Sequence, residues 1–138
     1  MKKDKLGYSK EKINHAAYLL VDDDIDHLTT FTMILEEAGY SVDKCTGSDA
    51  ALLEFKPSYY NLSVLDYRMP SLNGLGLYKR IREMDPTAKV LIITAAFEEL
   101  NEDVDNQTQQ DNVRVIRKPV SNGELLSEIK STLGDTKK

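Results

Sequence analysis

The sequence predicts an α/β domain with a five-stranded parallel sheet and helices on both faces. Five short apolar runs fit buried strands, and stretches with apolar residues at helical spacing separate them. Strands that alternate with helices in this way form parallel sheets that are covered on both sides. At 138 residues, the chain is long enough for one domain around a single core.

Composition narrows the class of protein. The net charge of -5 and the pI near 5.0 argue against a nucleic-acid-binding surface, which needs clustered lysine and arginine. No apolar run approaches the ~20 residues that span a membrane, and the N-terminus lacks a signal-peptide core, so we expect a cytoplasmic protein without a membrane partner. The single cysteine, Cys45, lies in an apolar-alternating stretch and should be a buried, unreactive thiol.

The predicted domain fills nearly the whole chain. Residues 1–15 are expected to form a flexible, Lys-rich tail, residues 16–134 the domain, and residues 135–138 a short C-terminal tail. Because so few residues follow the last predicted helix, we expect a stand-alone domain without an attached output domain.

In the first half of the domain, each predicted strand leads into a helix. The strand at 17–21 ends in three aspartates, and the helix at 25–38 ends at Gly39, which is typical of a left-handed C-terminal residue. A second strand at 40–45 precedes a short helix at 48–55, whose first residue, a serine, is expected to cap it.

The second half repeats this alternation. Its predicted strands lie at 62–66, 89–94 and 113–116, and its predicted helices lie at 74–84 and 121–133. Ser121 and Glu124 match a capping box for the last helix. Residues 97–112 carry a few apolar residues at helical spacing among acidic and amide side chains, which predicts a short, exposed helix.

Polar residues follow the strands where each one ends. The third strand stops on Asp66, before a loop with Pro70, which cannot extend a central strand. The corresponding positions after the first, fourth and fifth strands hold Asp22 and Asp23, Thr94, and Lys118. Right-handed crossovers with a reversal of strand order place the first and third strands side by side, so these residues should converge at the edge where open α/β sheets bind ligands.

This set of side chains fits one kind of chemistry. Three carboxylates at one edge repel each other and raise each other's pKa. A hard divalent cation removes this repulsion, and Mg²⁺ is suitable because it keeps waters and open positions for phosphate. An aspartate can attack phosphorus to give an acyl phosphate, and catalysis of that step is mainly positioning and charge neutralisation. Lys118 would supply positive charge and Thr94 a hydroxyl donor.

Taken singly, these residues have ordinary structural roles. The aspartates at 22–24 could cap the first helix and favour its positive end, Thr94 could cap a helix, and the lysine could be a solvated surface residue. A calcium loop is disfavoured because its sixth and twelfth positions hold His27 and Met33 in place of glycine and glutamate. His27 and His15 lack metal-ligand spacing and are expected at the surface.

The joint pattern resembles the receiver domain of two-component response regulators over about residues 16–134. The resemblance rests on the acidic pair after the first strand, the threonine after the fourth, the Lys-Pro after the fifth, and the segment LDYRMPSLNG at 65–74. It implies a flavodoxin-like, doubly wound five-stranded parallel sheet of order 2-1-3-4-5 with five helices.

The resemblance also implies a function. Asp66 would be the phosphoacceptor of a phosphorelay, taking a phosphoryl group from a sensor histidine kinase or phosphotransfer protein and signalling through altered affinity for an output protein. Such a domain is not an enzyme with a separate substrate, although it assists its own Mg²⁺-dependent phosphorylation and dephosphorylation. We expect a monomer or weak dimer that binds no nucleic acid.

Two groups of site residues are implied by the resemblance. The implied ligands of Mg²⁺, which Mn²⁺ can replace, are Asp23 and Asp66 directly, Asp22 through water, and the backbone carbonyl of Arg68. The implied phosphoryl-binding residues are Thr94, which rotates to bond the phosphoryl oxygen, Ala95, which leaves room behind it, and Lys118, which pairs with the phosphoryl group. The peptide bond between Lys118 and Pro119 is implied to be cis, a form otherwise found in roughly 5–6% of such bonds.

Three features depart from the family pattern. Val115 stands where the family often has an aromatic residue whose movement reports phosphorylation. Arg68 places a long cation two residues after the acceptor and is predicted to alter the lifetime of the acyl phosphate. The acidic segment 97–112 is a poor match to the usual helix and partner surface of that region.

Two other functions fit part of the pattern. A small aspartate-dependent phosphatase, similar to the haloacid dehalogenase group, would have its nucleophile after the first strand and a second aspartate two residues on. Asp22 and Asp24 have that spacing, but Asp66 would then have no role and the chain is short for a substrate cap. A receiver-like binding module that is never phosphorylated is disfavoured, because no position of the phosphorylation set is missing.

Overall fold

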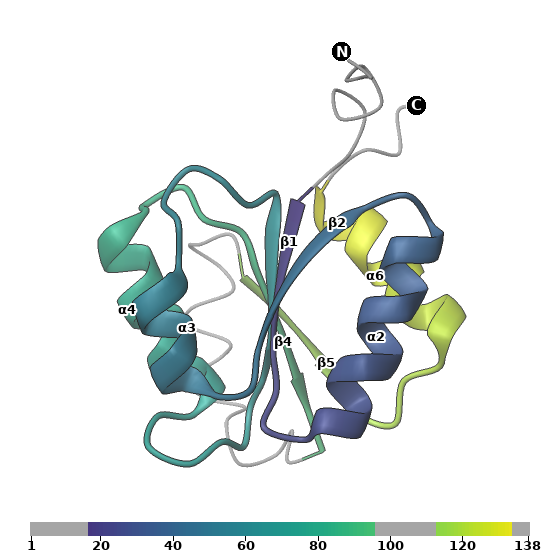
Figure 1. Cartoon of the computed structure of the whole chain (residues 1–138), viewed down its shortest axis with the longest axis horizontal. Coiled ribbons are helices and arrows are strands. Elements are labelled where there is room, and N and C mark those ends of the chain that lie inside the picture. Colours follow the sequence, from purple (N-terminus) through teal and green to yellow (C-terminus); the bar gives the residue numbers. More distant parts are fainter. Residues whose placement is uncertain (1–16, 96–112, 134–138) are drawn as a thin grey trace.

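The computed structural model describes residues 17–95 and 113–133. Within these ranges, five parallel strands form one sheet in the order β2-β1-β3-β4-β5, which confirms the predicted fold class (Figure 1). The strands are β1 (Ala17–Val21), β2 (Ser41–Cys45), β3 (Leu62–Asp66), β4 (Val90–Thr94) and β5 (Val113–Arg117). The helices of the described part are α2 (Ile25–Glu37), α3 (Ser48–Glu54), α4 (Gly74–Met84) and α6 (Asn122–Leu133). The predicted helix at 97–112 and both predicted tails lie outside the described residues.

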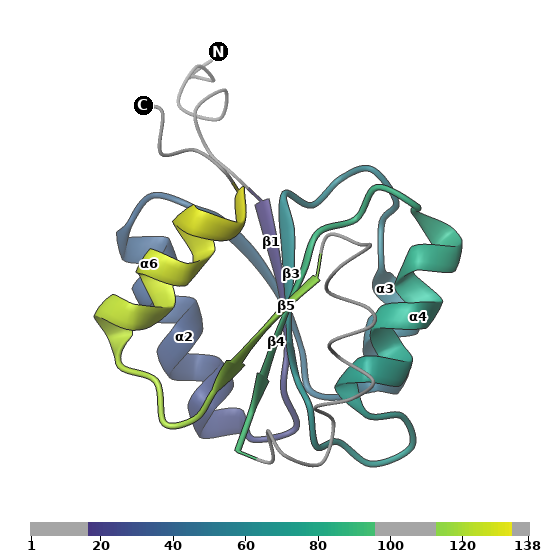
Figure 2. The same ribbon diagram turned by 180° about the vertical axis from the view of Figure 1, so that it is seen from behind.

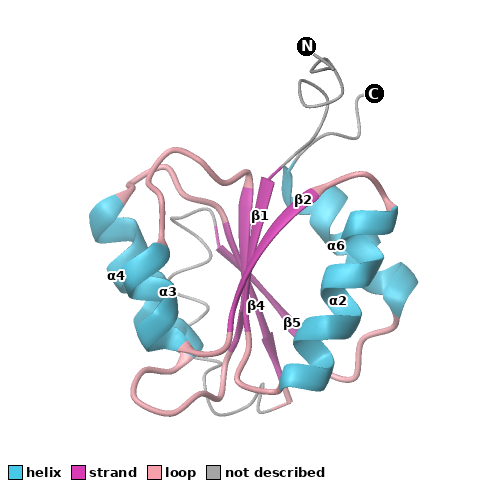
Figure 3. Ribbon diagram, viewed as in Figure 1, coloured by secondary structure: helices cyan, strands magenta, loops and turns pink. Residues whose placement is uncertain are grey.

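Helices cover both faces of the sheet. Figure 1 shows α3 and α4 on one side and α2 and α6 on the other, and the reverse view in Figure 2 shows the same two layers. Figure 3 marks the strands between them by secondary structure. Every residue of β3 and β4 is buried, as expected for central strands that are covered on both faces. No helix in the described ranges combines the length and apolar character needed to cross a membrane.

Each strand contributes to two cores, because successive side chains point to opposite faces. The core beneath α3 and α4 includes Leu19, Leu65 and Ile92 from the sheet. The core beneath α2 and α6 includes their neighbours Leu20 and Val64. Packing in the two cores fixes which side chains of each strand face which layer of helices. It therefore also fixes the residue at which each strand reaches the edge of the sheet.

The two helices on one face of the sheet, α2 and α6, begin with side-chain caps. Asp24 accepts the N–H groups of Asp26 and His27 at the start of α2. Before α6, the Ser121 N–H donates to Glu124 Oε1 at 2.8 Å and the Glu124 N–H donates to Ser121 Oγ at 3.1 Å. This reciprocal pair is the predicted capping box.

The start of α3 differs from the prediction. Gly47 is the N-cap residue and no side chain caps this helix, so the expectation that Ser48 caps it was wrong. The Ser48 side chain is instead buried, and its hydroxyl donates to the Pro70 carbonyl at 3.3 Å. The sequence suggested a local cap, whereas the hydroxyl bonds a segment that is distant along the chain.

The connection from β3 to α4 is tight. The Gly74 N–H donates to the Tyr67 carbonyl at 2.7 Å, and the Asn73 side chain accepts the Gly76 N–H at 2.9 Å. A Cβ at Gly74 would lie 2.6 Å from the carbonyl oxygen of Asp66. Glycine therefore allows α4 to begin directly against the end of the strand that carries Asp66.

Asp85, a buried residue after α4, joins two loops. Its carboxylate accepts the Ser58 N–H at 2.8 Å, the Thr87 N–H at 3.1 Å and the Thr87 hydroxyl at 2.9 Å. Ser58 has a φ of 63°, a conformation uncommon for non-glycine residues, and this bond holds its backbone. The Ser58 N–H is the main cause that lowers the pKa of Asp85, against the opposing effect of burial.

We expect Gly74→Ala to lower the free energy of unfolding by about 1–3 kcal/mol, because the added methyl group forces α4 away from the strand end. Gly123→Ala is the matched control, since a Cβ there meets nothing within 4 Å and alanine is the better helix former. Urea denaturation measures both variants. Equal stability of the two would contradict the close-packing interpretation.

Stability should also depend on the charge of Asp85. Its folded-state pKa is lowered, so the carboxylate contributes fully above its unfolded pKa of about 3.9 and loses this contribution as pH falls through the folded value. Because Asp85→Asn does not titrate, the gap in unfolding free energy between wild type and this variant should shrink as acid is added. Urea unfolding between about pH 7 and pH 3 tests this, and a gap independent of pH would count against it.

Candidate functional site

Three carboxylates meet at the carboxyl end of the sheet. One oxygen from each of Asp22, Asp23 and Asp66 lies within 4.8 Å of the other two. The cause is the strand order, because β1 and β3 are neighbours and Val21 is paired with Leu65. Asp22, directly after β1, and Asp66, the last residue of β3, therefore emerge side by side. Asp22 and Asp66 are buried, whereas Asp23 is exposed.

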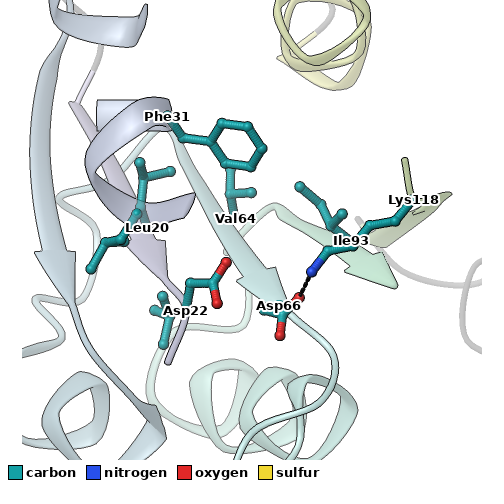
Figure 4. Close-up of a pocket in the computed structure, with 9 residues that line it drawn as sticks. Leu20, Asp22, Phe31, Val64, Asp66, Ile93 and Lys118 are labelled. Atoms are coloured by element: carbon teal, nitrogen blue, oxygen red, sulfur yellow. Dashed lines mark ion pairs between the residues drawn. The ribbon is translucent and has the colours of Figure 1, made fainter. Parts of the chain in front are cut away.

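Lys118 balances part of this negative charge. Its Nζ lies 2.6 Å from Asp66 Oδ1, and Figure 4 shows the lysine reaching Asp66 from the side opposite Asp22. The Lys118 N–H donates to the Thr94 carbonyl at 2.7 Å, which fixes the lysine beside the end of β4. Its peptide bond to Pro119 is cis, in agreement with the expectation from the resemblance.

The pKa of Asp22 is raised, and burial is the largest cause. The charge of Asp66 adds to this shift, whereas the Asp24 N–H, Lys118 and His27 oppose it. The Asp24 N–H donates to Asp22 Oδ1 at 2.9 Å, so one oxygen of Asp22 is held by the backbone. The cluster therefore carries more buried negative charge than its neighbours neutralise, which is the condition that a bound cation relieves.

Thr94 and Ala95 occupy the same edge. The register pairs Asp66 with Ile93, so Thr94, which is buried, ends the neighbouring strand one residue farther along. Ala95 is exposed and lines a groove of about 530 Å³ together with Lys118 and Pro119. The structure thus brings every residue of the predicted set to this end of the sheet.

Arg68 lies in the loop after β3, on the side of Asp23. An open pocket of about 500 Å³ is lined by Asp23, Tyr67, Arg68, Met69, Pro70 and Asn73. The loop thereby brings one cation and several polar groups next to the exposed carboxylate of the cluster. The oxygen donors that the described residues bring together here are carboxylates, which suit Mg²⁺ or Mn²⁺ better than a metal that prefers sulfur or nitrogen.

Sequence reasoning missed the place of His27. It was expected to be a surface residue, and its side chain is 49% exposed, but its Nδ1 lies 3.7 Å from Asp22 Oδ2 and 3.6 Å from Asp24 Oδ2. The signal was present in its position three residues after the N-cap of α2, where a side chain lies over the start of the helix. Asp24, in turn, caps α2 and, among the described aspartates, does not belong to the group whose carboxylates lie close enough to hold a metal ion.

Cys45 is buried at the end of β2, as predicted. Burial and the neighbouring Glu54 raise the pKa of its thiol to about 11, so it is an unreactive core residue and contributes nothing to the site.

The chain shares its sequence pattern with response regulators. Residues 18–130 match the family model of the response regulator receiver domain. The response regulator receiver protein CpdR of Brucella abortus (strain 2308) is 32% identical over 116 residues, which are 83% of this chain and 94% of that protein. A transcriptional regulatory protein, the CpxR homolog of Haemophilus influenzae, is 33% identical over 115 residues. The chain spans about half the length of that relative, since the match covers 49% of it.

The fold agrees with this assignment. A solved CheY-like response regulator receiver domain protein from Methanospirillum hungatei JF-1 has a TM-score of 0.76 and 26% identity to this chain, covering 88% of it and 96% of the solved chain. The strand order, the acidic cluster and the family match over residues 18–130 lead to one conclusion. The chain belongs to the family of response regulator receiver domains.

Proposed function

We propose that the protein is the phosphoacceptor of a two-component phosphorelay and that Asp66 is the residue phosphorylated. The observation that supports this most directly is the environment of the Asp66 carboxylate. It lies within 4.8 Å of the oxygens of Asp22 and Asp23 and 2.6 Å from Lys118 Nζ. Asp66 is the member of this cluster that is placed between a cation and an acidic metal-binding pair.

In the proposed reaction, a carboxylate oxygen of Asp66 attacks the phosphorus of a phosphohistidine. The new bond joins this oxygen to phosphorus, while the bond from phosphorus to the donor nitrogen breaks and its electron pair stays on the imidazole. Lys118 pairs with the incoming phosphoryl oxygens, and the Thr94 hydroxyl donates a hydrogen bond to one of them, with Ala95 leaving space behind it. These groups lower the barrier chiefly by fixing position and neutralising charge.

The carboxylate cluster fits a divalent cation. Asp23, Asp66, the Arg68 carbonyl and, through water, Asp22 would hold Mg²⁺ or Mn²⁺. When bound, the cation neutralises charge on the phosphoryl oxygens and the aspartates. Lys118 then retains its ion pair with Asp66 before transfer and with the phosphoryl group afterwards, so the positive charge stays where negative charge accumulates.

The proposed partners follow from this chemistry. The donor is a sensor histidine kinase or a phosphotransfer protein in the cytoplasm, and the phosphorylated domain acts by changing its affinity for an output protein. The phosphatase alternative needs Asp24 as its second aspartate, two residues after the nucleophile, but the Asp24 carboxylate caps α2 by accepting two backbone N–H groups. This engagement favours the phosphoacceptor function over the phosphatase.

Phosphorylation should require Asp66 and a divalent cation. With acetyl phosphate and Mg²⁺, we expect a slower band for wild type on a Phos-tag gel and no such band for Asp66→Asn, which lacks the nucleophilic oxygen. Addition of EDTA should abolish the wild-type band. Phosphorylation of Asp66→Asn, or of wild type in EDTA, would falsify the proposal.

Arg68 should prolong the life of the acyl phosphate, because a cation in the pocket beside Asp23 can pair with the phosphoryl group or obstruct the attacking water. We expect the acyl phosphate of Arg68→Ala to hydrolyse roughly threefold faster, which corresponds to a loss of about 0.6 kcal/mol, less than one typical hydrogen bond. The rate of dephosphorylation after removal of the donor measures this. Arg80→Ala is the control, since Arg80 pairs with Glu83 at 3.5 Å on α4, and indistinguishable lifetimes for the two variants would refute the role.

A further inference from the structure

The loop at residues 67–73 is attached to the first turn of α3 by two side-chain hydrogen bonds. Ser48 Oγ donates to the Pro70 carbonyl at 3.3 Å. Next to it, Ser71 Oγ donates to Asp49 Oδ2 at 3.3 Å. Each bond joins residues 22 positions apart in the sequence. We call these two bonds the α3 attachment.

Ser48 has no local reason to be a buried serine. The side chain is 1% exposed, and α3 is not capped by any side chain, since its N-cap is Gly47. A buried hydroxyl is costly unless it is hydrogen-bonded, and the partner of this one is the Pro70 carbonyl. The serine is therefore matched to the loop and not to its own helix.

A backbone hydrogen bond joins the two ends of the loop, and the α3 attachment holds its middle residues, Pro70 and Ser71. At the base, the Gly74 N–H donates to the Tyr67 carbonyl at 2.7 Å, and within the loop the Leu72 N–H donates to the Pro70 carbonyl at 2.8 Å. Ser71 has a φ of 72°, so the chain reverses there in a left-handed conformation. Along the chain, Arg68 therefore lies between Tyr67 at the base and the attached residues Pro70 and Ser71.

We propose that Ser48 and Asp49 are positioning residues for the divalent cation. They hold the loop so that the Arg68 carbonyl can complete the oxygen ligands supplied by the aspartates. This inference rests on the proposed function, because it takes the Arg68 carbonyl as a ligand. Neither residue touches the carboxylate cluster, so both act through the backbone of the loop.

The effect should appear as weaker metal binding with little change in the chemistry of Asp66. Loss of one typical hydrogen bond, at the buried hydroxyl of Ser48 or at the exposed, solvent-screened carboxylate of Asp49, corresponds to about a fivefold change in an equilibrium constant. We therefore expect Ser48→Ala and Asp49→Ala each to raise the dissociation constant for the cation about fivefold. At saturating Mg²⁺, the rate of phosphorylation by acetyl phosphate should match that of wild type, since the nucleophile and Lys118 are unchanged.

Two control variants test whether the effect on metal binding comes from positioning of the loop. One controls for a loss of general stability and the other for a loss of charge. Thr32→Val removes another buried hydroxyl, which has no hydrogen-bond partner among the described residues, and should leave metal binding unchanged. Asp49→Asn keeps an acceptor for the Ser71 hydroxyl without the charge, and should restore wild-type binding. Asp49 and Ser71 are exposed, so substitutions there keep the test available if Ser48→Ala folds poorly.

The experiment is titration of the full chain with Mg²⁺ by calorimetry and with Mn²⁺ by electron paramagnetic resonance, alongside urea unfolding of each variant without metal. Weaker binding by Ser48→Ala and Asp49→Ala, with normal binding by Thr32→Val and Asp49→Asn, supports the proposal. Wild-type affinity in Ser48→Ala and Asp49→Ala, whatever their stability, overturns it while the proposed function stands. Absence of cation binding by wild type itself, together with no phosphorylation of Asp66, would instead overturn both.

Discussion

The ion pair between Lys118 and Asp66 is the interaction on which the site depends. The neighbouring positions of β1 and β3 place Asp22 beside Asp66 at the sheet edge, and two buried carboxylates this close repel each other. The lysine, at 2.6 Å from Asp66, supplies a positive charge that offsets part of this repulsion. Its position depends in turn on β5 lying beside β4, where its backbone N–H bonds the Thr94 carbonyl. A different strand order would leave the same residues as separate surface charges.

Helices on both faces of the sheet hold the residues at this edge in position, by different contacts. The start of α2 is fixed by its Asp24 cap, which holds the acidic pair after β1 in place. On the other face, the contact between Gly74 and the Asp66 carbonyl lets α4 begin against the strand end. The attachment of the loop to α3 adds a third support. The side chains gathered at this edge therefore come from strand ends and from the loops that follow them, and their positions are determined by rigid elements.

Much of this arrangement could be predicted from the sequence, because apolar runs identify strands and polar residues mark where they end. The order of the sheet and the gathering of strand-end residues followed from the βα alternation and the family resemblance. One prediction failed because it treated a side chain as having a local partner: Ser48 was expected to cap its own helix, but it bonds Pro70. His27 is exposed, as expected, and what the sequence did not give was its approach to Asp22. The bond of Ser48 joins segments 22 residues apart that meet only after folding, whereas the position of His27 three residues after the N-cap of α2 was a local signal.

The buried Cys45 thiol has a practical consequence. With a pKa near 11, it carries roughly a hundredfold less thiolate at neutral pH than an ordinary cysteine, and maleimides and similar reagents react with the thiolate. A cysteine introduced at an exposed position would therefore take up a fluorophore or spin label while the native thiol stays unmodified. Distance measurements between two such labels could then compare the domain before and after treatment with a phosphoryl donor, without first deleting a core side chain.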